Sequence, residues 1–446
     1  MKVCKVLWPL MLLLLFGTPA ALAQSMTLSE AIAGAVAHNP QMIAVRHGVA
    51  AAASQTKVAR SGLLPQLEVS ETFNRTNSPL WAFGTKLNQG IIQTSDFNPD
   101  ELNDPDAINN FNTALSLSWN LWDGGRTRIG WQQARQSQQI EALELQRTEQ
   151  FIIAQSAKIY VGLLLADENR HVIEQSLNTA KAHLKLAQDR FRGGLAVKSD
   201  VLRAEVRIAD LEQQRLMADS QIQVAQAALH AVMGREDAEP VAPATPLDRC
   251  LAPQGELALW VEHAMDRRPE LQQAGLRQAI AEKEVARAKA GHLPTLALQG
   301  NYEINSEDFS DSHDDYAVGA VVRVNLYSGQ RISSQAAAAR SEAARAKALR
   351  HSLALAVRVE TQRAYYQAQS AWQSIDVARQ AVDQADEGLR IVGNRYAGGL
   401  LNIVDLLDAQ VALQQARTRH FRALHDYKVA RVDLAMASGT LDKDFK

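Results

Sequence analysis

Hydrophobic and polar residues alternate with a period of two along residues 111–121. Even positions in this segment carry small or polar side chains, whereas the odd positions carry Phe111, Thr113, Leu115, Leu117, Trp119 and Leu121. Such alternation predicts a β-strand with one apolar face, of the length that a tilted membrane strand needs. Similar alternation predicts further strands at about residues 66–76, 295–304 and 316–326. The chain is therefore expected to contain four membrane-competent strands.

Long segments of a different pattern surround these strands. Between Gly125 and Gly193 the chain has no proline and only two glycines, Gly130 and Gly162, among abundant Ala, Gln, Leu, Glu and Arg. This composition predicts one helix of roughly 60 residues, which at 1.5 Å per residue is about 90 Å long. A Gly-Gly pair then marks a turn and a returning helix. We expect two such helical hairpins, at about residues 127–233 and 331–438.

The same order of sequence motifs and predicted elements occurs twice along the chain. The segment R-F-R-G-G-L-A-V-K-S-D-V-L-R-A-E at 190–205 returns as R-Y-A-G-G-L-L-N-I-V-D-L-L-D-A-Q at 395–410, an offset of 205, the difference between 395 and 190. Arg268-Pro269-Glu270 repeats Asn39-Pro40-Gln41 at an offset of 229, the difference between 268 and 39. Between the strands, we expect a long irregular loop at Ser78–Asn110 and a shorter acidic loop at Glu303–Asp315. The sequence predicts a tandem duplication of helix, strand, loop, strand, long helix, turn and helix.

The N-terminus has the pattern of a secretory signal peptide. Lys2 and Lys5 precede an apolar run from Val6 to Phe16, and Ala21-Leu22-Ala23 forms a cleavage site. A capping box at Thr27–Glu30 predicts the first mature helix, at 31–38. The expected organisation is a signal peptide (1–23), a first repeat (24–235), a Pro-rich linker (236–255), a second repeat (256–439) and a C-terminal tail (440–446).

Composition narrows the function classes. The 446-residue chain has a net charge of −2 and no basic patch, which argues against nucleic acid as a partner. Cys250 is the only cysteine after the predicted signal, so no internal disulfide is expected. Apolar runs near ~18 residues are also absent after the signal, so we expect no membrane-spanning helix. The 11 histidines are scattered, and the motifs H-E-x-x-H, G-x-S-x-G and G-x-x-x-x-G-K-[ST] do not occur. We expect neither an enzyme nor a cofactor or metal site.

Four strands are too few for a closed barrel, because bacterial barrels begin at about eight strands. Open edges in lipid leave backbone groups unpaired, at several kcal/mol each. A barrel shared between chains removes these edges. The pattern therefore predicts an oligomeric tube with a short β end in the outer membrane and a long helical end in the periplasm.

These motifs, in this order and twice, resemble the TolC family of outer-membrane efflux proteins over essentially the whole mature chain. The resemblance rests on N-P-Q and R-P-E, the G-x-x-P helix ends, N-L-W-D-G-G-R and N-L-Y-S-G-Q-R, and the tips F-R-G-G-L and Y-A-G-G-L. It implies a mainly α fold, a homotrimer in which an α-helical barrel continues into a shared 12-stranded transmembrane β-barrel in the outer-membrane lipid. It also implies a periplasmic adaptor (membrane fusion) protein and an inner-membrane transporter as partners, in drug or metal efflux or in type I secretion of proteins.

The resemblance also assigns roles to residues of the two hairpin turns. It places adaptor contacts at the tips, on Phe191, Gly193, Gly194, Leu195, Tyr396, Gly398, Gly399 and Leu400. Asp405 and Asp408 resemble the acidic constriction of the periplasmic gate, and Tyr396 matches a gating tyrosine. Some relatives tie the tip closed with an arginine where this chain has Leu401, so the resemblance implies a different latch here.

Alternatives remain for several of these residues. Asp200 and Asp405 lie near the start of returning helices, where a carboxylate interacts favourably with the helix dipole, and we expect this helix-cap role for Asp200. A periplasmic coiled-coil adaptor or structural rod is the second function class, but it leaves the four strands unexplained. Drugs, other small molecules, metals and secreted proteins all remain possible as cargo, and the lack of a Met- or His-rich tract mildly disfavours metal.

Overall fold

A computed structural model describes residues 24–442, apart from 237–238, 250 and 253. The predicted signal peptide and Cys250 lie outside the described residues. The described chain forms two compact units. The first unit combines residues up to Met42 with Glu149–Trp260 and the chain from Thr361 onward, and the second combines Ile43–Thr148 with Val261–Glu360. Both units draw on both halves of the sequence, so neither unit corresponds to one repeat.

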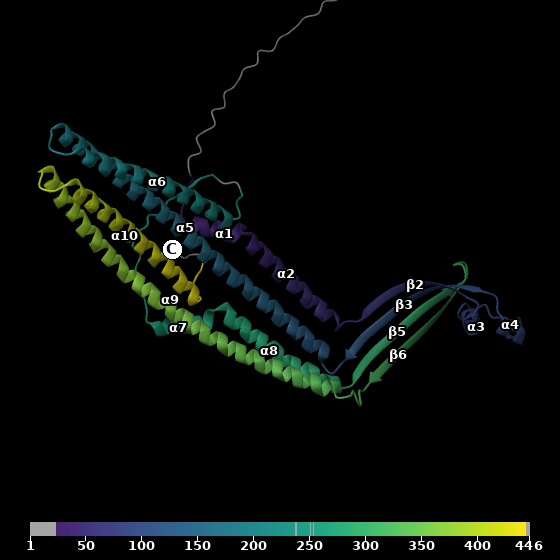
Figure 1. Ribbon diagram of the computed structural model, residues 1–446. Coiled ribbons are helices and arrows are strands. Elements are labelled where there is room, and N and C mark those ends of the chain that lie inside the picture. Colours follow the sequence, from purple (N-terminus) through teal and green to yellow (C-terminus); the bar gives the residue numbers. More distant parts are fainter. Residues whose placement is uncertain (1–23, 237–238, 250, 253, 443–446) are drawn as a thin grey trace, which may run out of the picture. The chain divides into compact units, whose positions relative to one another are not determined.

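Four long helices carry the first unit (Figure 1). They form two hairpins, α5 (Arg126–Arg192) with α6 (Lys198–Val232), and α9 (Arg331–Ala397) with α10 (Ile403–Ala437). Small and aliphatic residues pack between α9 and α10, where Ala364 and Ala368 contact Ala430 and Leu434. The N-terminal parts of α5, up to Thr148, and of α9, up to Glu360, belong to the second unit. The two helices expected from the long Gly- and Pro-poor segments are therefore present, each unbroken over 67 residues.

The short elements of the first unit close its core. Helix α1 (Leu28–His38) begins at the predicted capping box, in which Thr27 and Glu30 exchange hydrogen bonds. Ile32 on this helix packs on Ile153 of α5 and Val432 of α10. The predicted linker 236–255 contains strand β4 (Val241–Pro243), which pairs in parallel with β1 (Gln24–Met26). This segment therefore contributes a strand to the first unit, in addition to connecting the two repeats along the chain.

The second unit contains a four-stranded sheet of order β2-β3-β5-β6 and the helices that precede it (Figure 1). The strands are β2 (Gln66–Thr76), β3 (Ile108–Trp122), β5 (Thr295–Ser306) and β6 (Ser312–Arg323). Every neighbouring pair is antiparallel, and the β3–β5 pair joins the first repeat to the second. Helices α2 (Pro40–Ser61) and α8 (Pro269–Lys289) lead into the first strand of each repeat, the second through a 3₁₀ turn at Ala290–His292. Helix α7 (Leu257–Arg267) precedes α8.

The register gives the sheet one apolar and one polar face. Val69, Leu115, Tyr302 and Tyr316 form one continuous row across all four strands, and all four side chains are exposed. On the opposite face, β3 and β5 are linked by polar side chains: Asn110 Nδ2 donates to Asn305 Oδ1 at 2.8 Å, Asn112 Nδ2 to Glu303 Oε2 at 3.0 Å, and Ser116 Oγ to Asn301 Oδ1 at 2.8 Å. The period of two seen in the sequence thus separates a mainly apolar surface, on which Glu71 accepts a hydrogen bond from Thr113, from a hydrogen-bonded polar one.

Both predicted loops between strands need correction. The segment expected as irregular at Ser78–Asn110 contains helix α3 (Pro79–Asn88), a 3₁₀ turn η1 (Thr94–Phe97) and helix α4 (Pro99–Asn103). A 2.8 Å ion pair between Lys86 and Asp96 holds these short elements together. The acidic loop expected at Glu303–Asp315 is mostly strand, since β5 continues to Ser306 and β6 begins at Ser312. Cross-strand pairing overrides the low strand propensity of the acidic residues there.

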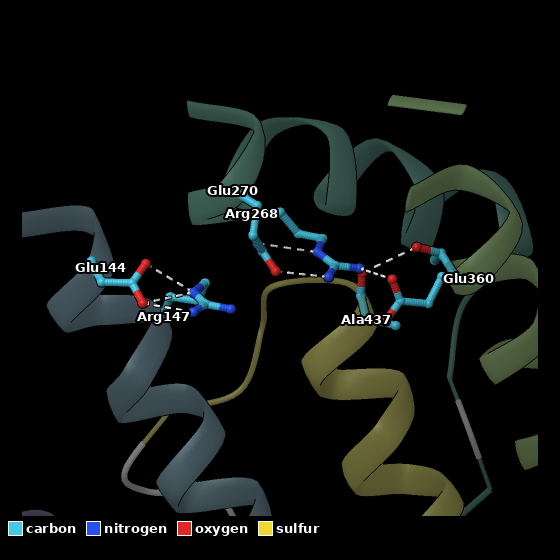
Figure 2. A network of polar contacts seen from close by, with 7 residues as sticks. Glu144, Arg147, Arg268, Glu270, Glu360 and Ala437 are labelled. Atoms are coloured by element: carbon cyan, nitrogen blue, oxygen red, sulfur yellow. Dashed lines mark hydrogen bonds and ion pairs between the residues drawn. The ribbon is translucent and has the colours of Figure 1, made fainter. Parts of the chain in front are cut away.

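The repeated Asn-Pro-Gln and Arg-Pro-Glu motifs begin α2 and α8 by different means. Asn39 Oδ1 accepts the backbone N–H of Gln41 at 2.8 Å. The Arg268 side chain, only 8% exposed, instead contacts Glu270 at 2.9 Å and Glu360 at 2.7 Å (Figure 2). Burial alone raises the pKa of the Glu270 carboxyl, but the hydrogen bond and charge of Arg268 outweigh it and hold that pKa below its usual range. The second motif is therefore a partly buried ionic junction.

No helix within the described residues is sufficiently long and apolar to cross a membrane.

Candidate functional site

The two hairpin turns in the first unit have the same backbone geometry. Gly194 and Gly399 have φ angles of +74° and +77°, a conformation that favours glycine. In each turn a backbone N–H bonds back to a carbonyl five residues earlier, from Leu195 to Arg190 at 2.8 Å and from Leu400 to Arg395 at 2.9 Å. This is the bond pattern of a Schellman motif, which ends a helix on an αL glycine. The Gly-Gly pairs are thus explained by turn chemistry, including Gly193 and Gly398, which precede the αL positions.

The tips of the two hairpins share a small hydrophobic core. Tyr396 lies at its centre with only 2% of its surface exposed. Around it pack small and aliphatic side chains of the other three tip helices, α5, α6 and α10, namely Ala187, Val201, Ala204, Ile403 and Leu406. Burial raises the pKa of the Tyr396 phenol above its ordinary value, and nearby Asp200 adds to this shift while Arg190 opposes it. Tyr396 is therefore a neutral core residue of the tip at physiological pH.

Arg190 joins the two tips. Its Nη1 donates hydrogen bonds to the backbone carbonyls of Tyr396 and, at 3.2 Å, Ala397, and its guanidinium lies 5.0 Å from the centre of the Tyr396 ring. Charge-assisted hydrogen bonds of this kind are stronger than those between neutral groups. Sequence reasoning gave Arg190 no role, although its coincidence with Arg395 in the repeat marked both positions.

A polar seam continues this contact along the hairpins. The buried Gln410 side chain donates to the carbonyl of Ser176 at 2.7 Å. Further along, Gln414 Nε2 donates to Gln214 Oε1 at 2.8 Å, and Arg207 donates to Gln414. Hydrogen bonds between buried or half-buried side chains of two helices fix the register of the helices as well as the distance between them. Arg190 and this seam therefore hold the two hairpins of one chain to each other.

The two carboxylates predicted for the gate lie on one face of α10. Asp405 and Asp408 are three residues apart and both exposed, whereas Ile403, two residues before Asp405, and Leu406 are buried in the tip core. The Asn402 side chain accepts the backbone N–H of Asp405 and caps the helix. This face of the chain is consequently acidic, solvated and rigidly anchored from behind.

The expectation for Asp200 as the helix cap is corrected by the structure. The N-cap residue of α6 is Val197, and no side chain accepts a hydrogen bond there. Asp200 lies in the first turn instead, where its charge still interacts favourably with the helix dipole. The repeats differ here because Val197 stands at the position that Asn402 occupies in the second copy, at the same offset of 205.

Large apolar side chains are exposed around the turns. Phe191 is 42%, Leu195 73% and Leu400 77% exposed, whereas Leu401 is half-buried. Leucines that a folded chain leaves in water at the end of a hairpin form a small apolar patch of the kind found at protein contact sites. The tips therefore combine a buried tyrosine, an arginine clamp, an acidic face and an apolar end.

Comparison with known proteins shows which family the chain belongs to. The sequence profile described as "Outer membrane efflux protein" matches residues 31–235 and 260–440, which is most of the chain and covers both repeats. The chain belongs to the outer membrane efflux protein family. As a member of the TolC family, it is an efflux channel of the outer membrane that extends into the periplasm, and it is a transport protein rather than an enzyme.

Relatives and solved structures agree over almost the full length of this channel. The chain is 29% identical to Protein CyaE of Bordetella pertussis, covering 95% of this chain and 86% of that protein. It is 27% identical to the outer membrane protein TolC of Vibrio cholerae, with 98% and 96% covered. Its fold matches the CmeC outer membrane channel of Campylobacter jejuni with a TM-score of 0.78 at 17% identity, over 94% and 87% of the two chains. The TolC resemblance and the duplicated fold expected from the sequence are thereby confirmed.

Proposed function

We propose that three copies of this channel assemble side by side into one closed tube. The observation that carries the proposal is the four-stranded sheet, whose outer strands β2 and β6 each have one edge unpaired within the described residues. In lipid such edges are costly, and pairing β6 of one copy with β2 of the next satisfies them. Four strands from each of three copies form a 12-stranded barrel, with the exposed row Val69, Leu115, Tyr302 and Tyr316 toward lipid.

The polar face of the sheet then lines the pore. Asn112, Ser116 and Asn301 on that face are satisfied by hydrogen bonds within the sheet. These groups, together with the Glu303 carboxylate that accepts from Asn112, are engaged in bonds within the sheet. The pore wall is therefore polar but gives passing molecules no strong binding site, which is what a conduit for varied cargo requires. We propose that the cargo is drugs, other small molecules or secreted proteins, delivered by an inner-membrane transporter.

The hairpin tips are the proposed contact with a periplasmic adaptor protein. Phe191, Leu195 and Leu400 are exposed at the turns, and burying them against a partner stabilises the contact by removing apolar surface from water. Gly193, Gly194, Gly398 and Gly399 shape the turns that present these side chains. We place the adaptor here because this is the part of the helical end with exposed leucines on rigid turns.

Asp405 and Asp408 form the proposed periplasmic gate. Both are exposed on one face of α10. Three copies bring two carboxylates each to one ring at the end of the tube, where like charges repel one another and attract cations. A divalent cation held in this ring obstructs the pore. Tyr396 supports the gate from behind, through the core that anchors Ile403 and Leu406.

Single-channel conductance in a planar bilayer tests this function. We expect a small conductance that divalent cations block from the periplasmic side, with the block lost in the variant Asp405→Asn with Asp408→Asn. The matched control, Glu205→Gln with Glu212→Gln, removes two exposed carboxylates elsewhere on the hairpins and should leave the block intact. An equal block in the Asp variant would place the gate elsewhere. A folded trimer that conducts no ions would contradict the channel and favour a periplasmic rod.

A further inference from the structure

The Arg190 clamp has an unused copy in the second repeat. Arg395 occupies the same position at an offset of 205 and begins the same turn. Within the described part of the chain, its side chain is exposed and has no hydrogen-bond or ion-pair partner. One of two equivalent arginines is therefore engaged and the other is free.

The pair of carbonyl groups that accepts the hydrogen bonds of Arg190 also has an unoccupied equivalent in the first repeat. Arg190 donates to the carbonyls of Tyr396 and Ala397. The equivalent carbonyls in the first repeat are those of Phe191 and Arg192, in a turn with the same bonds: Gly194 N–H donates to Phe191 O at 3.0 Å, as Gly399 N–H does to Tyr396 O. A carbonyl has two lone pairs, so the Phe191 oxygen can accept a second hydrogen bond, as the Tyr396 oxygen does.

The space around the two αL glycines shows the same asymmetry. A side chain built on Gly399 would meet Arg190 Nη2 at 3.2 Å, so the arginine packs directly on that turn. At Gly194 nothing lies within 4 Å. The Phe191 ring is likewise 42% exposed, whereas its counterpart Tyr396 is buried under Arg190. The first-repeat turn therefore has an unoccupied guanidinium position beside Gly194 and the carbonyls of Phe191 and Arg192, which we call the empty seat. The equivalent position at the second-repeat turn holds the Arg190 guanidinium.

We propose that Arg395 fills this seat on a second copy of the chain, donating to the carbonyls of Phe191 and Arg192 and covering the Phe191 ring. The proposal rests on the trimeric tube proposed above, in which hairpins of the first and second repeat alternate around a ring. Each first-repeat tip then holds its own second-repeat tip through Arg190, and each second-repeat tip holds the next copy through Arg395. The same type of arginine–carbonyl contact thus operates within one chain, through Arg190, and between chains, through Arg395.

Charges around the empty seat are mixed. Asp189 is one turn away, a carboxylate where the second repeat has the neutral Asn394, and it attracts an incoming guanidinium. Arg192 pairs with Asp189, and the Lys198 ammonium lies 6.0 Å from the Phe191 ring centre, so both cations oppose it. The balance makes this contact weaker than the Arg190 clamp. A weaker contact between copies is suited to a tip that must open while each chain stays intact.

Thiol crosslinking tests the predicted proximity. In a Cys250→Ser background we combine Arg395→Cys with Phe191→Cys and treat the purified protein with a short bifunctional thiol reagent. Covalent species of two and three chains are expected on a denaturing gel. The control pair Arg190→Cys with Ala397→Cys, in which Ala397 is exposed and its carbonyl accepts from Arg190, should give a crosslink within one chain and no species larger than one chain. Either single variant, Arg395→Cys or Phe191→Cys, should leave the chains separate.

The oligomeric state, measured by light scattering on the same samples, separates the two proposals. A trimer that yields no multi-chain crosslink overturns the Arg395 contact and leaves the trimeric channel standing. A monomer overturns the trimer itself. In a second measurement, Arg395→Ala should lower the temperature at which the trimer dissociates. Arg395→Lys should restore only part of this loss, because the lysine ammonium lacks the planar set of N–H donors with which a guanidinium binds two carbonyls at once. An unchanged dissociation temperature in Arg395→Ala would also overturn the contact.

Discussion

The side-chain oxygen of Asn402 accepts the backbone N–H of Asp405 at 3.0 Å, and thereby fixes the start of α10 beneath the proposed gate. Val197, its counterpart in the first repeat, cannot accept such a bond, and α6 starts without a side-chain cap. The two returning helices are otherwise built alike, from 35 residues each. The better-anchored helix start is therefore the one that carries the paired carboxylates.

Replacing Asn402 with Ala should loosen the first turn of α10. Loss of an N-cap costs about 1 kcal/mol, which is roughly a fivefold loss of protection from local opening. Hydrogen exchange of the amides at 403–406 is the measurement. The reverse change, Val197→Asn, is the matched variant and should slow exchange at 198–201. Equal exchange in Asn402→Ala and the parent protein would show that the cap does not hold this turn.

Arg190→Ala should separate the two hairpin tips of one chain. The change removes charge-assisted bonds to two carbonyls, worth about 1.5–3 kcal/mol, and uncovers the Tyr396 ring. Limited proteolysis at the turns should become several times faster. Arg192→Ala is the control, because Arg192 is a highly exposed neighbour whose pair with Asp189 contributes little. If both variants are cleaved at the same rate, Arg190 is not a clamp.

The sequence predicted the elements that have a strong local signal. The alternation at 111–121 and the Gly-Gly pairs each have one dominant physical cause, pleat or turn, and β3 and both turns lie where these patterns place them. Helices α3 and α4 were missed because their segments are short and their contacts, such as Lys86 with Asp96, are tertiary. The duplication showed that Arg190 and Arg395 are equivalent, but only the packing shows that one is engaged and the other exposed.

Acid should weaken the junction at the start of α8. Arg268 holds the pKa of Glu270 below its ordinary value of 4.5, so the folded state binds this proton less readily than the unfolded state. The resulting stabilisation is complete above the ordinary carboxyl pKa and is lost as the pH falls through the lowered one. Glu270→Gln should therefore destabilise the protein near neutral pH and flatten the acid side of its stability curve.

Thermal unfolding between pH 3 and pH 7 measures this effect. Glu387→Gln is the control, since Glu387 also has a lowered pKa from its hydrogen bond to Arg390 but lies in solvent, where such a pair contributes little. If the Glu270 and Glu387 variants show the same dependence of stability on pH, the ionic junction does not stabilise the protein.

Tyr396 should tolerate loss of its hydroxyl and not of its ring. Among the described residues the buried Oη has no hydrogen-bond partner, so Tyr396→Phe removes an unsatisfied polar atom and should be neutral or stabilising. Tyr396→Ala empties the centre of the tip core, at a cost of about 3–5 kcal/mol. Because burial raises the phenol pKa above 10.0, the parent tip should also loosen as the pH rises beyond that value, and Tyr396→Phe should not. Hydrogen exchange of the tip amides from pH 7 to pH 11, corrected for intrinsic rates, distinguishes the three proteins. A Phe variant as loose as the Ala variant would mean that the hydroxyl, and so a partner outside this chain, holds the tip together.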